Sequence, residues 1–198
     1  MSDIICITNR KLCKGDFVER IKAVAETKPK AIILREKDLD ENEYTMLAEK
    51  IMLVCAKYYV PCILHSFSGA AIRLNADAVH LPLPLLRKMT EREKASFKHI
   101  GTSCHSLAEA EEAETLGCTY LITGHIFDTD CKRNIPSRGL AFLSEICSKA
   151  KIPVYAIGGI NRLNISSVTE AGAAGACVMS GLMGCENVRL YMEELKSG

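Results

Sequence analysis

Strand-like and helix-like segments alternate along this chain, and that alternation is the strongest constraint on its fold. Several strand-like runs, such as Ala31–Leu34 and Val154–Ile157, are apolar throughout, with no alternation between apolar and polar residues. A strand with that pattern is buried on both faces, as in a parallel sheet covered by helices. The eight strand-like runs are Ile4–Thr8, Ala31–Arg35, Pro61–Leu64, Ala78–Leu81, His99–Thr102, Tyr120–Thr123, Val154–Ile157 and Gly175–Met179.

A segment with helical periodicity follows each run, and some of these segments carry clear end signals. Ser106–Glu109 has the pattern of a capping box, and Gly117 and Gly172 stand where helices commonly close. The helical segments are Phe17–Glu26, Glu41–Tyr58, Ser68–Asn75, Thr90–Ser96, Leu107–Leu116, Gly139–Ala150, Asn164–Ala171 and Val188–Lys196. Eight such units in 198 residues predict an α/β protein, a (β/α)8 TIM barrel in one domain over residues 1–198. A doubly wound open sheet is the alternative.

Composition and charge argue against several classes of partner. The chain has 25 Lys and Arg against 24 Asp and Glu, with no basic run, so we expect neither nucleic acid nor an anionic membrane as a partner. We see no signal peptide and no apolar stretch that could span a bilayer, so we expect a cytoplasmic protein. The ten cysteines contain no C-x-x-C pair, which favours free, packed thiols. The oligomeric state, a homo-oligomer included, stays open.

A histidine stands at the end of the sixth strand-like run. His125 follows Tyr120–Thr123 and Gly124, at the carboxyl end of the strand, where barrel enzymes place their reacting groups. An imidazole has an unperturbed pKa of about 6.5, so it can take and return a proton near neutral pH. The sequence therefore makes His125 a candidate for proton transfer, although a loop histidine without chemistry would look the same.

Glycine-bearing loops follow the last two strands. Gly158 and Gly159 end the seventh strand-like run, and Ser180 and Gly181 follow the eighth. Loops in these two positions of a (β/α)8 barrel often bind phosphate, because glycine lets backbone N–H groups approach an anion closely. We therefore expect a phosphate site between them.

Charged and hydroxyl side chains end the second and fifth strands. Arg35 and Lys37 flank Glu36, and we expect only one of the two cations to point into the barrel mouth. Ser103 follows the fifth strand, where its hydroxyl could hold an anion at the mouth. His105 could be a second imidazole at the mouth or a structural residue of the loop.

The remaining strand ends offer histidines and few acids. His65 and His80 fall at the ends of the third and fourth strands, with their roles left open. The acids near strand ends are Glu36, Asp128 and Asp130, whereas magnesium prefers carboxylates beside substrate phosphates. We therefore expect no metal site.

Six segments, in order and over nearly the whole length of the chain, carry recognisable motifs: Leu34–Lys37, Ala76–Leu81, Gly101–His105, Gly124–Lys132, Ala156–Ile160 and Val178–Gly181. Together they resemble the thiamine phosphate synthase/TenI family. The resemblance implies a (β/α)8 barrel that holds a small-molecule thiazole phosphate between its last two loops.

Departures from the synthase pattern point to the TenI-like branch of that family. The synthase pattern has Gln where this chain has Ile33, Asn-Asp where it has His65-Ser66, and Gln and an acid where it has Leu83 and Leu85. The Gly-His motif and the Thr-Asp-Cys-Lys loop of Gly124–Lys132 are the mark of the TenI branch, whose members are thiazole tautomerases.

The resemblance therefore implies a thiazole tautomerase of thiamine biosynthesis, an isomerase that needs no cofactor, with His125 as the proton-transfer residue. The substrate's phosphate is expected on the amides of Gly158, Gly159, Met179 and Ser180, with Ser103 also at the substrate. Arg35, Lys37 and Lys132 are the candidate partners of the substrate's carboxylate. One alternative is a thiamine phosphate synthase, which joins a pyrimidine pyrophosphate to thiazole phosphate. Another is a non-catalytic, regulatory barrel that binds a thiazole phosphate.

Overall fold

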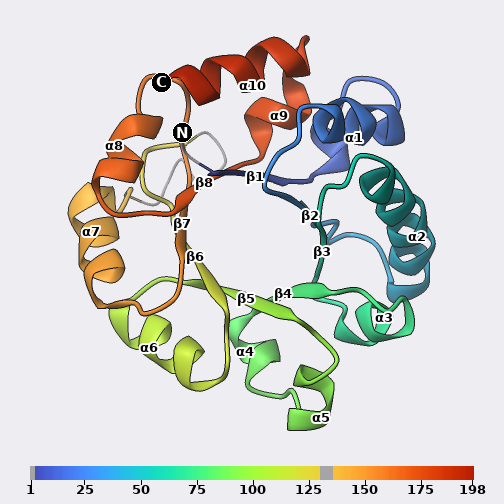
Figure 1. Ribbon diagram of the computed structural model, residues 1–198, viewed down its shortest axis with the longest axis horizontal. Coiled ribbons are helices and arrows are strands. Elements are labelled where there is room, and N and C mark those ends of the chain that lie inside the picture. The colour runs from blue at the N-terminus through green and yellow to red at the C-terminus, as the bar shows by residue number, and fades with distance from the viewer. Residues whose placement is uncertain (1–2, 130–135) are drawn as a thin grey trace.

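The strands close into one parallel barrel with helices around it, as Figure 1 shows for the computed structural model. The structure describes residues 3–129 and 136–198. The strands are β1 (Asp3–Ile7), β2 (Ala31–Leu34), β3 (Cys62–His65), β4 (Ala78–Pro82), β5 (His99–Cys104), β6 (Tyr120–Gly124), β7 (Val154–Ile157) and β8 (Gly175–Val178). Each strand pairs in parallel with the next, and β8 pairs with β1. The (β/α)8 prediction is therefore confirmed, and the open sheet is excluded.

The helices form the outer layer of the molecule. They are α1 (Phe17–Glu26), α2 (Glu41–Lys57), α3 (Ser68–Arg73), α4 (Leu83–Leu86), α5 (Glu91–Lys94), α6 (Leu107–Thr115), α7 (Gly139–Lys149), α8 (Ile165–Glu170), α9 (Ser180–Gly184) and α10 (Val188–Ser197), with a 3-10 helix η1 (Arg10–Leu12) after β1. The sequence pattern did not predict η1, α4 and α9 as separate helices. Short helices like α4 are hard to detect, because Pro84 is tolerated in a first turn although proline usually indicates a break.

The apolar strands pack on both faces, which explains why they lack alternation. In β1, Ile4 and Cys6 face the helices, whereas Ile5 and Ile7 belong to a separate cluster inside the barrel. The other buried members of the inner cluster are Ala31, Ile33, Ile63, Ala78, Tyr120, Ile122, Tyr155 and Cys177. Inward-facing positions therefore alternate along every strand, and their last members line the mouth of the barrel.

The predicted helix ends are found, with one difference in detail. Gly117 and Gly172 have φ of 89° and 97°, the left-handed conformation that closes a helix. The Ser106 side chain accepts from the Glu109 N–H at 3.1 Å, as a cap should. However, the Glu109 carboxylate accepts from the His105 N–H at 2.6 Å rather than from Ser106, so the capping box is only half formed.

Two further observations concern the described residues as a whole. None of the helices found there is long and apolar enough to cross a membrane. The nine cysteines outside the undescribed segment are free thiols, and five of them are buried.

Candidate active site

A cavity of about 900 Å³ opens at the carboxyl ends of the strands. Each strand contributes at least one residue to its wall, which follows from the inward-facing positions described above. These residues are Ile7, Ile33, His65, His80, Ser103, Ile122, Ile157 and Cys177. The cavity is also lined by the predicted substrate-binding and catalytic residues that the structure describes, so it is the candidate active site.

His125 lies in this cavity directly after β6. Its side chain is buried, with 4% of the residue exposed. The backbone around it is fixed on two sides, because the Arg138 N–H donates to the His125 carbonyl at 3.0 Å and the Ile126 N–H donates to the Ile157 carbonyl at 2.9 Å. The imidazole is therefore held at the carboxyl end of the barrel by its own loop and by β7.

The two glycines after β7 allow the loop after β6 to approach. Gly158 and Gly159 have φ of 107° and 65°, a region that side chains disfavour. A Cβ on Gly158 would overlap the Cα and Cβ atoms of His125, and one on Gly159 would overlap the Asp128 carbonyl. These glycines therefore have a packing role beside His125, whether or not they also bind an anion.

The loop after β8 faces the same part of the cavity. Met179 precedes α9 and Ser180 is its first residue, and both line the cavity together with Gly158 and Gly159. The four residues predicted to hold a phosphate are thus brought together in one place.

Arg35 and Lys37 both line the cavity, so the expectation that only one of them would face it was wrong. Residues two positions apart in an extended chain point to the same side, and it is Glu36 between them that points to the other. Glu36 accepts from the Thr8 hydroxyl at 2.6 Å and from the Arg10 N–H at 3.0 and 3.1 Å.

These hydrogen bonds hold the Glu36 side chain against Thr8 and η1, so it does not line the cavity. Its side chain is 1% exposed and also pairs with the Arg10 guanidinium at 3.2 Å. The Arg10 guanidinium in turn pairs with Asp38, and the hydrogen bonds from Arg10 and Lys11 hold the pKa of the Asp38 carboxyl well below its usual range.

The described residues do not fit a magnesium ion. Among the residues at 3–129 and 136–198, the carboxylates that line the cavity are Glu109 and Asp128, and Glu109 is already bonded to the His105 N–H. The carboxyl ends of β3 and β4 present His65 and Pro82 to the cavity instead of acids. No cluster of three or more potential metal ligands occurs in those ranges, and magnesium requires oxygen ligands.

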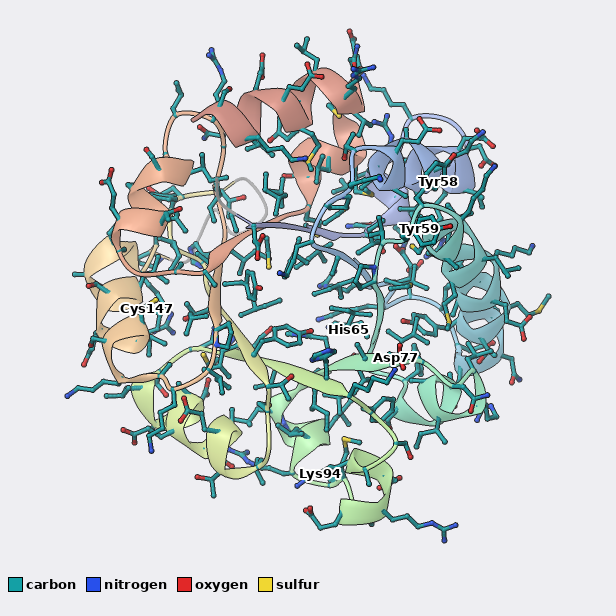
Figure 2. The ribbon with its side chains drawn as sticks, in the orientation of Figure 1. Tyr58, Tyr59, His65, Asp77, Lys94 and Cys147 are labelled. Atoms are coloured by element: carbon teal, nitrogen blue, oxygen red, sulfur yellow. The ribbon has the colours of Figure 1, made fainter. Side chains whose placement is uncertain are left out.

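His65 and His80 form a buried pair on the floor of the cavity, and Figure 2 shows His65 inside the ring of strands. Their rings are stacked with centroids 5.7 Å apart. Burial lowers the pKa of each to about 3, and the charges of Arg35 and Lys37 add to the shift at His65. Both imidazoles are therefore neutral at physiological pH.

The roles of His65 and His80 were not predicted, although the alternation of side chains along their strands indicates that both face the cavity. Ile63 and Ala78 face the barrel interior. Residues two positions further along each strand, His65 and His80, must then face inward as well.

Ser103 and His105 also reach the cavity. The Ser103 hydroxyl lies 2.9 Å from His80 Nε2, and His105 Nδ1 lies 3.1 Å from the Gly124 carbonyl oxygen. His105 is therefore bound to the backbone next to His125. Lys132, the third candidate cation, lies outside the described residues.

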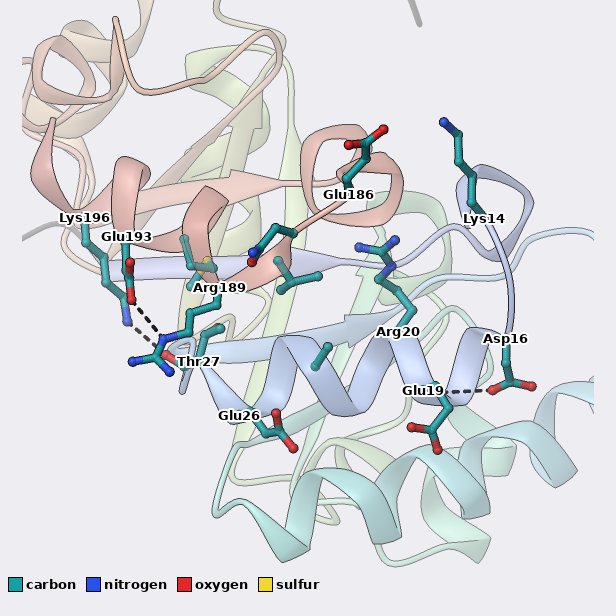
Figure 3. Close-up of a pocket in the computed structure, with 14 residues that line it drawn as sticks. Lys14, Asp16, Glu19, Arg20, Glu26, Thr27, Glu186, Arg189, Glu193 and Lys196 are labelled. Carbon is teal, nitrogen blue, oxygen red and sulfur yellow. Dashed lines mark hydrogen bonds and ion pairs between the residues drawn. The ribbon is translucent and has the colours of Figure 1, made fainter.

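A second cavity lies on the outside of the barrel, between α1 and α10 (Figure 3). Its wall mixes acids and bases, such as Glu19, Arg20, Glu186 and Arg189. The Arg20 guanidinium donates to the Leu182 carbonyl oxygen at 3.5 Å, so the wall of this cavity contacts α9. Of the residues predicted to bind substrate, none of those that the structure describes lines this second cavity.

Comparison with known proteins gives one consistent family. A chain of Syntrophomonas wolfei named thiamine-phosphate synthase is 33% identical over 197 residues, covering 96% of this chain and 92% of that one. A Clostridium tetani protein of the same name is 31% identical, covering 96% of this chain and 91% of that one. The solved structure of thiamine phosphate pyrophosphorylase from Pyrococcus furiosus superposes with a TM-score of 0.85 at 34% identity, covering 98% and 94% of the two chains. The sequence profile described as thiamine monophosphate synthase, TMP-TENI, matches residues 4–182. The chain thus belongs to the thiamine monophosphate synthase/TenI family.

Proposed function

We propose that this chain is a thiazole tautomerase, which converts a non-aromatic carboxythiazole phosphate into its aromatic isomer. The observation that carries the proposal is the position of His125, a buried imidazole in a cavity that it shares with the loops after β7 and β8. A substrate whose phosphate is bound by those loops would place its ring beside His125.

The reaction transfers one proton within the substrate. His125 takes the proton from the ring carbon that bears the carboxylate, and the electron pair moves through the ring to the exocyclic double bond. The resulting imidazolium returns the proton to the exocyclic carbon, so the enzyme ends in its starting state. Aromatisation supplies the driving force, and proton transfer by a positioned side chain typically accelerates a reaction by about 10²- to 10⁴-fold.

Other groups in the cavity fit the two anionic ends of such a substrate. The amides of Gly158, Gly159, Met179 and Ser180 would hold the phosphate, as backbone N–H groups do in related barrels. Arg35 and Lys37 would hold the carboxylate, since both line the cavity in the segment directly after β2. Both assignments are part of the proposal.

A second candidate function is thiamine-phosphate synthase. The names of the relatives favour it over the tautomerase, since both curated relatives described above carry that name. The described cavity argues against it, because departure of pyrophosphate is normally assisted by magnesium, which the ligands described above do not suit.

Two assays in parallel separate the candidates. In the first, the wild-type protein is given the non-aromatic carboxythiazole phosphate, and aromatisation is followed by ultraviolet absorbance or NMR. In the second, it is given thiazole phosphate and hydroxymethylpyrimidine pyrophosphate with magnesium. Aromatisation without coupling supports the tautomerase. Coupling without aromatisation would overturn it in favour of the synthase, and neither activity would favour a regulatory barrel.

A further inference from the structure

Tyr120, His80 and Ser103 form a hydrogen-bonded chain that runs from the barrel interior to the cavity. The Tyr120 hydroxyl lies 3.1 Å from His80 Nδ1, and His80 Nε2 lies 2.9 Å from Ser103 Oγ. Tyr120 and His80 are buried, whereas Ser103 is part of the cavity wall. The chain therefore connects an interior phenol to a hydroxyl that a ligand can reach.

Strand register explains how two side chains on non-adjacent strands meet. His80 on β4 is paired with Gly101 on β5, and Gly101 is paired with Tyr120 on β6. A Cβ on Gly101 would overlap the Tyr120 ring. The glycine thus leaves the space through which Tyr120 crosses β5 to reach His80.

The direction of the hydrogen bonds follows from counting donors and acceptors. A neutral imidazole has one donor and one acceptor, and His80 is neutral because burial lowers its pKa to about 3. Burial also raises the pKa of the Tyr120 hydroxyl well above its usual value, so the phenol keeps its proton.

Among residues 3–129 and 136–198, His80 Nδ1 is the only side-chain or backbone group that bonds the Tyr120 hydroxyl. Tyr120 must then donate to Nδ1, because a buried O–H without an acceptor would be costly. The proton of His80 consequently resides on Nε2 and is donated to Ser103 Oγ. The Ser103 hydroxyl then has no acceptor in His80, so its proton is available for a group bound in the cavity that Ser103 lines.

We infer that Tyr120 and His80 are positioning residues that hold the Ser103 hydroxyl as a hydrogen-bond donor to the substrate's carboxylate. The identity of the acceptor rests on the proposed function, and on Arg35 and Lys37, which line the same cavity. The direction of the hydrogen bonds does not depend on that function. It also means that His80 is not a general base for Ser103, because the shared proton belongs to the imidazole.

The direction can be tested without any ligand. The ¹⁵N chemical shifts of the His80 ring show which nitrogen carries the proton, and loss of the signals in His80→Asn assigns them. The expected result is a neutral ring with the proton on Nε2. A proton on Nδ1, or a charged ring at neutral pH, would overturn the inference.

The role in recognition is tested by binding of two probes, thiazole phosphate with and without its ring carboxylate. A hydrogen bond to a charged acceptor is strong enough that Ser103→Ala should weaken binding of the carboxylated probe about tenfold. Binding of the probe without the carboxylate should change less than about twofold. Tyr120→Phe removes the donor to Nδ1 and lets Ser103 turn towards His80, so it should reproduce part of the same loss.

The double variant distinguishes positioning from a structural effect. Tyr120→Phe should weaken binding no further in the Ser103→Ala background, because no hydroxyl remains to be positioned. Tyr155→Phe is the matched control, since its ring packs edge-on against Tyr120 but its hydroxyl is influenced by the charges of Asp3 and Lys30 rather than by His80. It should leave both affinities unchanged.

Additive losses, or equal losses for both probes, would show that Tyr120 does not act through Ser103 on a carboxylate. Failure of the proposed function is a separate result. A wild-type protein that does not aromatise the tautomer would disprove that function, whereas the ¹⁵N measurement would still decide the hydrogen-bond direction.

Discussion

Gly158 lies against His125 so closely that a Cβ on the glycine would overlap the Cα and Cβ atoms of the histidine. Gly158→Ala should therefore displace His125 or the loop after β7. We expect a loss of about 1–3 kcal/mol in the free energy of unfolding, measured in urea, because the residue also has φ of 107°. Aromatisation should fall at least tenfold.

Gly117→Ala is the control for Gly158→Ala. Gly117 has a comparable φ of 89°, but no atom beyond its immediate chain neighbours lies within 4 Å of the Cβ that would be added. It should lose about 1 kcal/mol of stability from backbone strain alone and keep full activity. Equal effects of the two substitutions on activity would show that contact with His125 is unimportant.

The buried histidine pair predicts how stability depends on pH. His65 and His80 have pKa values lowered to about 3, whereas an unfolded histidine has a pKa of about 6.5. Between these values the unfolded chain binds more protons, so folding stability rises with pH. The contribution is complete above about pH 6.5 and is lost progressively as the pH falls towards 3, at up to about 1.4 kcal/mol per pH unit for each histidine.

Urea unfolding at pH 7, 6 and 5 measures this dependence. His65→Asn removes one of the two groups, so the slope below pH 6.5 should decrease by about half. A stability that is independent of pH in the wild-type protein would mean that the two histidines stay accessible to protons in the folded state.

Glu36 should be a structural residue, although its neighbours Arg35 and Lys37 line the cavity. Its buried carboxylate receives hydrogen bonds from Thr8 and from Arg10. Glu36→Gln replaces one acceptor oxygen with a donor, which should destabilise the protein by about 1–3 kcal/mol in urea unfolding. Asp38→Asn, on the exposed side of the same network, should have a much smaller effect. A fully stable Glu36→Gln with impaired binding of thiazole phosphate would instead indicate a direct role at the substrate.

The fold was predictable from sequence because both faces of each strand are buried. Runs such as Val154–Ile157 contain only apolar residues, and this is sufficient to indicate a parallel sheet under helices. The short helices α4 and α9 were not predicted, because the proline of one and the two glycines of the other are residues typical of loops.

The site was predictable to the level of strand ends, and less so for individual side chains. His125, Gly158 and Ser103 were placed by their positions after strands, and the cavity brings them together. The shared orientation of Arg35 and Lys37 follows from their spacing of two residues, which the prediction misapplied. The pairing of His80 with Tyr120 depends on register across neighbouring strands. Register is fixed by long-range contacts, so a single sequence does not reveal it.

Proton transfer by His125 is tested most directly by comparing the rate of aromatisation by the wild-type protein with that by His125→Asn. His99→Asn is the control. His99 is exposed at the start of β5, at the opposite end of the barrel. If His125 transfers the proton, its substitution should slow aromatisation by about 10²- to 10⁴-fold. The affinity for thiazole phosphate should change less than about twofold, and His99→Asn should retain the wild-type rate. Aromatisation by His125→Asn at the wild-type rate would contradict the proposal that His125 transfers the proton.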